Sequence, residues 1–264
     1  MAEPSPALLA GRRGLVVGVS SERSLGFACA RAAHALGAEV AVTYRPGRRD
    51  TVPQLAERLG CAFSAPLDVD APASIAEVFT TIERRWGRLD FLVHTLMHVP
   101  PSLLAEPLTN IDRQGFARVL EVGVHSLLVL CRHARPLLER SSAPRVVTLS
   151  SPCGQRMTPH YHIAGIAKAA LESALLYLAQ ELGPAGILVN GVSPALIDTD
   201  GAVATVGRDV AASTRAHLAK KAATRSAVAP SDVGDCVAWL CSPYARQITA
   251  EVLTVDGGYG RNYF

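Results

Sequence analysis

The sequence predicts a doubly wound α/β fold, in which one seven-stranded parallel sheet carries helices on both faces. Seven short runs of β-branched or apolar residues recur along the 264 residues, and segments with helical spacing separate them. Strand and helix therefore alternate, which implies right-handed crossovers between parallel neighbours. Hydrophobic residues make up 49% of the chain, enough to bury both faces of such a sheet. We expect one domain over residues 1–264, because no repeat or low-complexity linker divides the chain.

The elements follow in a regular order. Strands are expected at residues 14–19, 39–43, 62–67, 91–93, 145–149, 187–192 and 252–255. Helices are expected at residues 25–36, 51–59, 74–86, 115–139, 161–182 and 231–240. The polar, Ala-rich stretch 198–225 breaks this rhythm. We interpret it as a loop with a helix, at the place where a substrate-binding lid would lie.

Charge and composition exclude several classes of protein. The 26 basic and 23 acidic residues give a net charge of +3 without a long block of one sign, so a nucleic-acid partner is not expected. The N-terminus lacks a signal-peptide pattern, and no apolar run approaches the roughly 20 residues that span a bilayer, so we expect a cytoplasmic protein without a membrane partner. The cysteines lack metal-ligand spacing and should be reduced thiols, with no metal bound; they are Cys29, Cys61, Cys131, Cys153, Cys236 and Cys241.

The first strand leads into a glycine-containing turn and then a helix. Gly18 permits a tight turn, and Gly26 permits close packing of the helix on the sheet. The N-terminus of that helix offers unpaired amides and the positive end of a dipole, which suit a phosphate group. The spacing is not G-x-G-x-x-G, and an ordinary strand-to-helix turn is the alternative. The place of the turn in the first βαβ unit favours dinucleotide binding.

The end of the second strand bears on the choice of cofactor. An NAD-binding unit usually has an acidic residue there, which takes the adenosine ribose hydroxyls. This sequence instead carries Arg45, Arg48 and Arg49. Guanidinium groups form bidentate bonds with a 2′-phosphate, so we expect NADPH in preference to NADH. A solvated basic loop is the alternative explanation.

A serine, a tyrosine and a lysine follow the fifth strand: Ser151, Tyr161 and Lys168. The chain resembles the short-chain dehydrogenase/reductase superfamily over nearly its whole length. The resemblance implies one NAD(P)-binding Rossmann domain. Besides the glycine turn and the Ser/Tyr/Lys region, it rests on Leu67-Asp68-Val69, Asn190 and Val255-Asp256-Gly257-Gly258.

The position of the tyrosine is similar to that in the enoyl-acyl-carrier-protein reductase branch of the superfamily. Ordinary members place the tyrosine thirteen residues after the serine and four before the lysine. Ala164 occupies that place here, and Tyr161 lies three residues upstream, which gives the Tyr-x6-Lys pattern of the branch. The segments 93–97 and 159–165 look like the branch as well. Val124 falls where ordinary members supply an asparagine to a proton relay.

The displacement of the tyrosine has a chemical purpose. Three helical residues rise about 4.5 Å, which moves the phenol away from a ketone that receives hydride at its own carbon. An enoyl thioester receives hydride at the β-carbon, so the group that contacts its oxygen must lie roughly 2.5 Å further from the nicotinamide. The position of Tyr161 therefore favours reduction of a carbon–carbon double bond.

The resemblance implies a role for each site residue. Tyr161 would bind the thioester oxygen, and Lys168 would bind the nicotinamide ribose and lower the phenol pKa. Ser151 would add a second donor to the oxygen, or it forms a turn. The further cofactor contacts implied are Gly18, Ser24, Leu25, Arg45, Arg48, Asp68, Val69, Leu96, Ile197 and Thr199. A helix-capping role for Asp68 and core roles for Leu25 and Leu96 are the alternatives.

Two further groups of residues have weaker claims to a role. Cys153 lies near the expected site, where it is either a reactive thiol or a packing residue. The histidines at positions 94, 98, 160 and 162 invite a proton-shuttle hypothesis. We assign them no such role, because a hydrogen-bonded structural histidine is the more common case.

The leading hypothesis is an NADPH-dependent enoyl-thioester reductase of fatty acid or related acyl biosynthesis, acting on a chain carried by an acyl carrier protein. The alternatives are a carbonyl reductase for a polyketide or other specialised metabolite, with Tyr161 as proton donor, and a binding module that keeps the fold without the chemistry. Members of the family assemble mostly as homotetramers through their long helices, here residues 115–139 and 161–182, so a homotetramer is expected.

Overall fold

Seven strands form one all-parallel sheet in the computed structural model, in the order β3-β2-β1-β4-β5-β6-β7. The structure describes residues 7–159 and 161–261. The strands are β1 (Arg13–Val17), β2 (Glu39–Tyr44), β3 (Phe63–Pro66), β4 (Phe91–His94), β5 (Arg145–Leu149), β6 (Leu188–Pro194) and β7 (Val252–Val255). The predicted seven-stranded parallel sheet is confirmed, with strand ends that differ from the expected ones by one or two residues.

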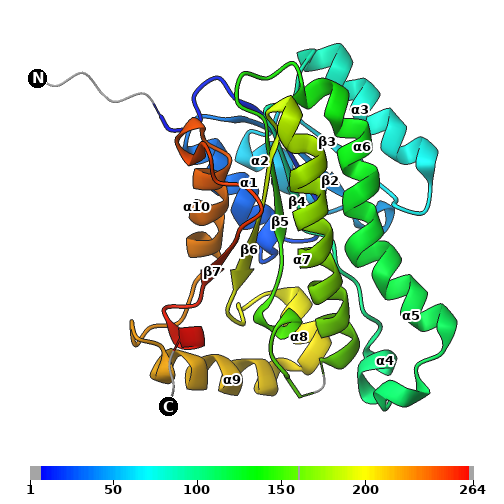
Figure 1. The fold of residues 1–264 in the computed structure, drawn as a ribbon, viewed down its shortest axis with the longest axis vertical. Coiled ribbons are helices and arrows are strands. Elements are labelled where there is room, and N and C mark those ends of the chain that lie inside the picture. The colour runs from blue at the N-terminus through cyan, green and yellow to red at the C-terminus, as the bar shows by residue number, and fades with distance from the viewer. Residues whose placement is uncertain (1–6, 160, 262–264) are drawn as a thin grey trace, which may run out of the picture.

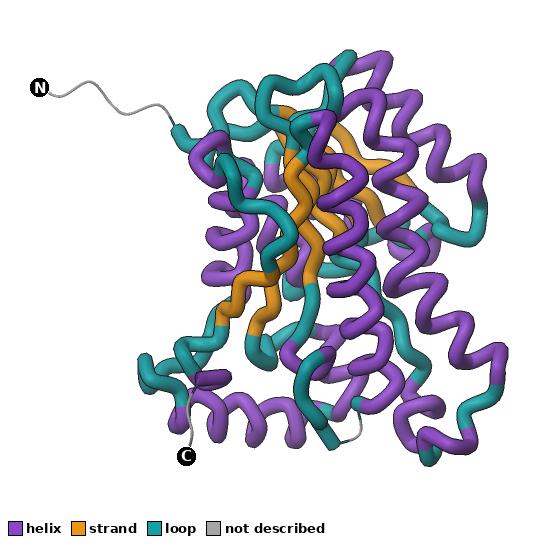
Figure 2. Tube along the Cα trace, viewed as in Figure 1, coloured by secondary structure: helices purple, strands orange, loops and turns teal. Residues whose placement is uncertain are grey.

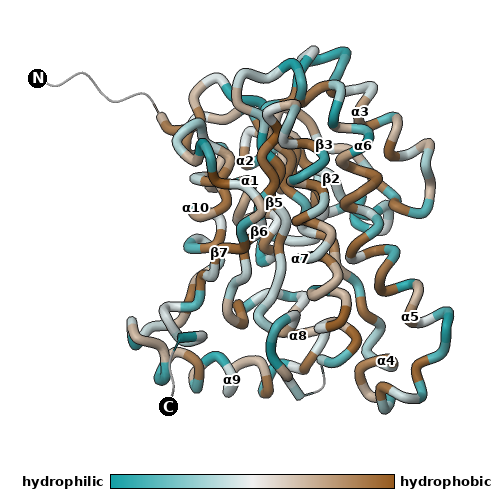
Figure 3. Tube along the Cα trace, in the orientation of Figure 1, coloured by the Kyte–Doolittle hydropathy of each residue, from teal (hydrophilic) through white to brown (hydrophobic). Residues whose placement is uncertain are grey.

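The central strands are apolar because helices cover both faces of the sheet. β4 and β5 are buried along their whole length, and hydrophobic residues run through the middle of Figure 3. Gly14 of β1 lies opposite Phe91 of β4. A Cβ at Gly14 would come within 1.9 Å of the Phe91 ring, so the glycine makes room for that ring.

Two helical layers enclose the sheet (Figures 1 and 2). One core cluster joins the sheet to α1 (Leu25–Ala35), α2 (Val52–Leu59) and α10 (Pro230–Leu240). A second cluster joins the other face to α3 (Pro72–Trp86), α6 (Ser126–Leu138) and α7 (His162–Leu182). The expected helices on both faces are therefore confirmed.

The long helix predicted at residues 115–139 contains an irregularity. It consists of α5 (Arg113–Leu120), a π-helical turn at Glu121–His125, and α6. Two stretches, Arg113–Leu138 and His162–Ala185, are long and apolar enough by composition to cross a membrane, although we expected no such run from the sequence. Both stretches include helices that pack on the sheet, and core helices commonly have this composition.

The chain order places a crevice at the carboxyl ends of β1 and β4. The strands run outward from β1 to β3 on one side and from β4 to β7 on the other, and ligands of such sheets bind where the order reverses. Three helices lie beyond this end of the sheet (Figure 1): α4 (Pro101–Ala105), α8 (Asp200–Val206) and α9 (Arg208–Lys221). The stretch expected to hold a loop with one helix thus contains two helices, α8 and α9.

Candidate active site

The turn after β1 brings the backbone close to its neighbours. Gly18 has φ +102°, and its amide donates to the Thr43 carbonyl at 3.2 Å. A Cβ at Gly18 would lie 2.7 Å from Cδ2 of Leu96. A Cβ at Gly26 would lie 2.9 Å from Oγ1 of Thr95. Both glycines are therefore needed where the turn meets the end of β4.

Ser24 begins helix α1 next to this turn. Its Oγ accepts from the Phe27 amide at 3.2 Å and donates to the Ser21 carbonyl at 2.7 Å. The serine fixes the helix start so that the positive end of the helix dipole faces the crevice. Leu25 packs against the first core cluster and Leu96 against the second, so both leucines also serve the core.

Positive charge gathers at the end of β2. Arg45, Arg48 and Arg49 are exposed, and their side chains form no hydrogen bond or salt bridge within the part of the chain that the structure describes. No acidic residue ends the strand, which closes with Tyr44. Burial, followed by the charges of Arg45 and Arg118, lowers the pKa of His98, which lies beyond the end of β4. The positive charge of Arg45 therefore contributes to the electrostatic environment of His98.

Asp68 and Val69 follow β3, on the far side of β2. Oδ1 of Asp68 accepts from the Asp70 amide at 3.1 Å, which forms a local turn. The helix-capping alternative for Asp68 is wrong, because Ala71 is the N-cap residue of α3. Val69 packs against the second core cluster. The turn places Asp68 at the carboxyl edge of the sheet, where an adenine amine would be bound.

Lys168 lies inside helix α7 with its ammonium group turned toward the sheet. Its side chain is buried, and Nζ donates to the Leu149 carbonyl at 2.7 Å. Burial lowers the pKa of Lys168 to about 8, while Glu172 and Cys153 act in the opposite direction. The solvated-lysine alternative is therefore wrong. A buried ammonium has two further N–H donors for a ligand.

Tyr161 is the N-cap residue of α7 and is half-buried in an apolar cluster. Burial, with a smaller contribution from Cys153, raises the pKa of its phenol to about 12, so the expected lowering of this pKa by Lys168 is wrong for the protein without a bound cofactor. Ala164, at the ordinary tyrosine position, is fully buried in the same cluster. The cluster also contains Met97, Val99, Leu103, Leu104, Ile111, Val119, Leu120, Ile163 and Ala167. The phenol thus lies beside an apolar surface that suits an acyl chain.

Ser151 opens the short turn at Pro152–Gly154, and its Oγ accepts from the Cys153 amide at 3.4 Å. This is the turn-forming role, and it leaves the hydroxyl proton available to a second acceptor. Cys153 influences the pKa of both Tyr161 and Lys168, so the turn lies close to the pair. All six cysteines are free thiols.

Ile197 and Thr199 follow β6, on the other side of the crevice. Ile197 is buried in the first core cluster, and Thr199 caps helix α8 by accepting from the Ala202 amide at 3.1 Å. Arg23 in the glycine turn forms salt bridges with Asp198 at 2.7 Å and Asp200 at 3.2 Å. The glycine turn and the start of the segment 198–225 are therefore held together.

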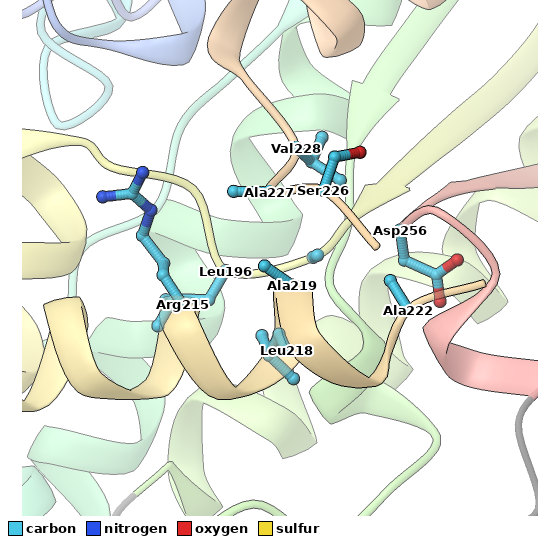
Figure 4. Close-up of a pocket in the computed structure, with 10 residues that line it drawn as sticks. Leu196, Arg215, Leu218, Ala219, Ala222, Ser226, Ala227, Val228 and Asp256 are labelled. Atoms are coloured by element: carbon cyan, nitrogen blue, oxygen red, sulfur yellow. The ribbon is translucent and has the colours of Figure 1, made fainter. Parts of the chain in front are cut away.

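A small pocket lies between α9 and the segments 195–196 and 226–228 (Figure 4). Side chains of α9 and of the segments 195–196 and 226–228 line it, together with Asp256. Arg215 of α9 forms a salt bridge with Asp198 at 3.3 Å, while its buried Nε has no hydrogen-bond partner. This ion pair joins α9 to the first residue of the segment 198–225.

His94 forms a buried polar network behind the crevice. Its Nδ1 lies 2.9 Å from Thr148 Oγ1, and its Nε2 lies 2.9 Å from Ser126 Oγ. Ser126 donates its own proton to the Val122 carbonyl at 2.6 Å, so it accepts from Nε2–H, and Nδ1 accepts from Thr148. Burial and the charge of Lys168 lower the pKa of His94 to about 3. His94 is therefore a neutral structural residue and does not act as a proton shuttle.

The other histidines differ in placement. His162 Nε2 donates to the Glu106 carbonyl at 3.0 Å, and its Nδ1 accepts from the Ile163 amide at 2.8 Å. His160 lies outside the described residues. Among the described residues, no three His, Cys, Asp or Glu side chains are grouped to hold a metal. Sequence reasoning overlooked Glu172, although its spacing of four residues from Lys168 places it one helical turn away.

These features define a class of protein. The glycine turn, the N-terminus of α1 and the exposed arginines suit a dinucleotide. Helix α7 adds a buried lysine, and a tyrosine stands at the start of the same helix. The fold and site are those of a nicotinamide-dependent oxidoreductase of the short-chain dehydrogenase/reductase type.

Comparison with known proteins gives the family. Residues 18–260 match a family model described as enoyl-(acyl carrier protein) reductase. The enoyl-acyl-carrier-protein reductase (NADH) FabI of Aquifex aeolicus is 34% identical, over 96% of this chain and 92% of that protein. The FabI of a Nostoc strain, also named as an NADH enzyme, is 36% identical, over 95% of this chain and 97% of that protein. The chain belongs to the enoyl-acyl-carrier-protein reductase family.

A solved structure agrees with the assignment. The Bacillus cereus enoyl-acyl carrier protein reductase, solved with NADP+ and indole naphthyridinone, superposes with a TM-score of 0.92 at 29% identity. The match covers 97% of this chain and 99% of that one. The predicted family and fold are confirmed, and the chain is an NAD(P)H-dependent oxidoreductase.

Proposed function

We propose that the protein reduces the double bond of a trans-2-enoyl thioester carried on an acyl carrier protein, in fatty acid or related acyl biosynthesis. The observation that carries the proposal is the place of Tyr161 at the start of α7, with buried Ala164 where an ordinary carbonyl reductase holds its acid. Family membership and the apolar cluster around the phenol support the same substrate class.

Tyr161 and Lys168 have different roles at the reacting end of the site. The bound dinucleotide supplies a hydride to the β-carbon. Tyr161 donates a hydrogen bond to the thioester oxygen and stabilises the charge of the enolate before the α-carbon is protonated. Lys168 would hold the nicotinamide ribose hydroxyls, and its positive charge would favour negative charge on the substrate oxygen. Ser151 can add a second hydrogen bond to the oxygen.

The rest of the crevice would hold the dinucleotide. Gly18 and Ser24 form the turn and helix start for the pyrophosphate, with Thr199 on the opposite side. Asp68 and Val69 would bind the adenine. The apolar side chains of Leu25, Leu96 and Ile197 would line the remainder, with Leu96 lying over Gly18.

Within this site we propose NADPH as the preferred cofactor. The curated relatives named above are NADH enzymes, whereas the Bacillus cereus structure contains NADP+. Within this chain, the proposal is supported by the exposed guanidinium groups of Arg45 and Arg48 beyond β2, because such groups suit a 2′-phosphate. One charge-assisted contact contributes about 1.5 kcal/mol, or roughly tenfold in kcat/KM.

The cofactor proposal is tested by kcat/KM with each dinucleotide. The unmutated enzyme should prefer NADPH at least about tenfold, and the double variant Arg45→Ala with Arg48→Ala should lose the preference. Arg58→Ala, an exposed arginine on α2, is the matched control. Equal efficiency with NADH and NADPH in the unmutated enzyme would show that these arginines do not select the cofactor.

The reaction itself is tested by comparing two thioesters. NADPH and NADH oxidation should be measured with crotonyl and acetoacetyl thioesters of the same carrier. Faster reaction of the crotonyl compound supports the proposal. Faster reaction of the acetoacetyl compound would identify a carbonyl reductase, and no reaction with either would favour a binding module.

The remaining proposals concern the surroundings of the site. We propose that segment 198–225 is the lid over the acyl chain, because α8 and α9 lie beyond the strand ends (Figure 1). We also propose a cytoplasmic homotetramer, with α6 and α7 at the subunit contacts. Exposed apolar residues on these two helices support that placement: Leu128, Ile166, Leu176 and Tyr177.

A further inference from the structure

The carboxylate of Glu172 joins two segments that border the reacting end of the site. Oε1 accepts from Ser150 Oγ at 2.5 Å, and Oε2 accepts from Gln155 Nε2 at 2.7 Å. Ser150 directly follows Leu149, whose carbonyl accepts the Lys168 hydrogen bond. Gln155 ends the turn that Ser151 opens. One side chain of α7 therefore holds both ends of segment 150–155.

Glu172 also stands in an electrostatic relation to Lys168. The two residues are four apart on α7 and so lie on the same face of the helix. The other titratable groups near the ammonium are Cys153 after β5 and His94 at the end of β4, and Tyr161 begins the same helix. Of this set Glu172 is the one carboxylate. His94 and Tyr161 are neutral at pH 7, since their pKa values are about 3 and about 12.

Burial of an ammonium group without a countercharge is costly. The Lys168 side chain is buried, and Leu149 supplies a neutral carbonyl. Glu172 is the carboxylate whose charge favours the ammonium form, at longer range than a direct ion pair, and its two hydrogen bonds fix where its own charge lies.

We propose that Glu172 is a positioning residue of the reaction, which keeps the buried Lys168 side chain charged and holds the segment that carries Ser151 and Cys153. The inference rests on the proposed function only through the role of Lys168 in binding the cofactor ribose. Glu172 itself touches Ser150 and Gln155, and its effect on chemistry passes through Lys168.

Two substitutions separate the charge of Glu172 from its hydrogen bonds. Glu172→Gln keeps an oxygen that can accept from Ser150 and removes the charge. Ser150→Ala removes that hydrogen bond and keeps the charge. Glu181→Gln, an exposed carboxylate on the same helix paired with Arg135 at 3.8 Å, is the matched control.

The first measurement is kcat/KM for crotonyl thioester as a function of pH. Without the carboxylate the pKa of Lys168 should fall further below about 8, so the alkaline limb of the Glu172→Gln profile should move down by about one pH unit. Activity at pH 8 should then fall roughly five- to tenfold, with little change at pH 6. Ser150→Ala should lower kcat without moving the limb. An equal loss at every pH in Glu172→Gln would overturn the proposal.

The second measurement needs neither cofactor nor substrate. The pKa of Lys168 is 10.5 ordinarily and about 8 in the folded protein, so the unfolded chain binds more protons between these values. The free energy of unfolding should therefore rise with pH across that window. In Glu172→Gln the rise should begin below pH 8, as followed by urea unfolding.

An unchanged stability profile in Glu172→Gln would overturn the proposal whatever the enzyme reduces. A shifted pH dependence of the unfolding free energy, in a protein that is inactive on enoyl thioesters, would support the coupling between Glu172 and Lys168. It would contradict the proposed reaction and not the coupling. The two inferences therefore fail separately.

Discussion

The phenol of Tyr161 should be the most sensitive hydroxyl in the site. Tyr161→Phe removes one hydrogen bond to the substrate oxygen and leaves the apolar ring in place. We expect kcat on crotonyl thioester to fall about 10²-fold or more, as for the loss of one oxyanion donor. The dissociation constant of NADPH, measured by fluorescence, should change little, because Lys168 remains.

Tyr177→Phe provides the control for this substitution. It makes the same chemical change on the same helix, at a side chain that is 70% exposed. It should leave kcat unaltered. An active Tyr161→Phe enzyme would mean that another group holds the enolate.

Ser151 should matter less than Tyr161. Its Oγ already accepts a hydrogen bond from the Cys153 amide, so its contact with the substrate oxygen is an additional role. We expect Ser151→Ala to lower kcat roughly tenfold. The kcat values of Ser151→Ala and Tyr161→Phe should be compared by steady-state kinetics. Equal losses of kcat would show that both hydroxyl groups bind the substrate oxygen.

Which of these residues could be predicted depends on how far apart their partners are in the sequence. Tyr161 and Lys168 belong to one helix, so their spacing can be read directly. The contact between Glu172 and Ser150 instead depends on how α7 packs on the end of β5, across 22 residues of chain. Spacing alone does not encode such a contact, and the carboxylate looked like an ordinary helix residue.

The π-helical turn at Glu121–His125 illustrates the same limit for a whole helix. Apolar spacing correctly predicts a helix over most of residues 115–139. The turn frees the Val122 carbonyl to accept from Ser126, which in turn accepts from His94 of β4. A partner on a distant strand supports the irregularity, so the local pattern does not reveal it. The segment 198–225 was expected to hold one helix and contains two, and its pattern was weak because Ala211 is the one residue of α9 that is buried.

The buried histidine in this network predicts a loss of stability in acid. The pKa of His94 is about 3 in the folded protein against an ordinary 6.5, so the unfolded chain binds an extra proton between these values. The free energy of unfolding should therefore decrease as pH falls from about 6.5 toward 3. Denaturant unfolding across this range should show the decrease.

Substitution of His94 tests the assignment. His94→Gln should be less stable at pH 7 by roughly 1–3 kcal/mol, because Ser126 and Thr148 lose well-placed partners. Its acid dependence should nevertheless be shallower than that of the unmutated protein. His217→Gln, at an exposed histidine of α9, should retain the full dependence. The same slope in all three proteins would mean that other groups cause the acid loss.

The architecture was the most predictable level of the structure. Strands covered on both faces need continuous apolar runs, and such runs stand out in the sequence even where their ends shift by a residue or two. The parallel order follows from the alternation of strands and helices. The apolar outer faces of α6 and α7 were not separable from their buried faces by sequence, because both faces contribute to one long apolar pattern.

Those outer faces lead to a prediction about assembly. Leu128, Ile166, Leu176 and Tyr177 are 40%, 37%, 51% and 70% exposed in the single chain. Exposed apolar side chains on two long helices are costly in water and suit a symmetric contact. Light scattering after size-exclusion chromatography should give a mass of four times the 27.9 kDa chain. The double variant Leu176→Glu with Tyr177→Glu should give smaller species, because it buries charge at that contact.

Tyr244→Glu, at a tyrosine that is 70% exposed on another part of the surface, should remain tetrameric. A monomeric unmutated protein would show that these faces are not subunit contacts.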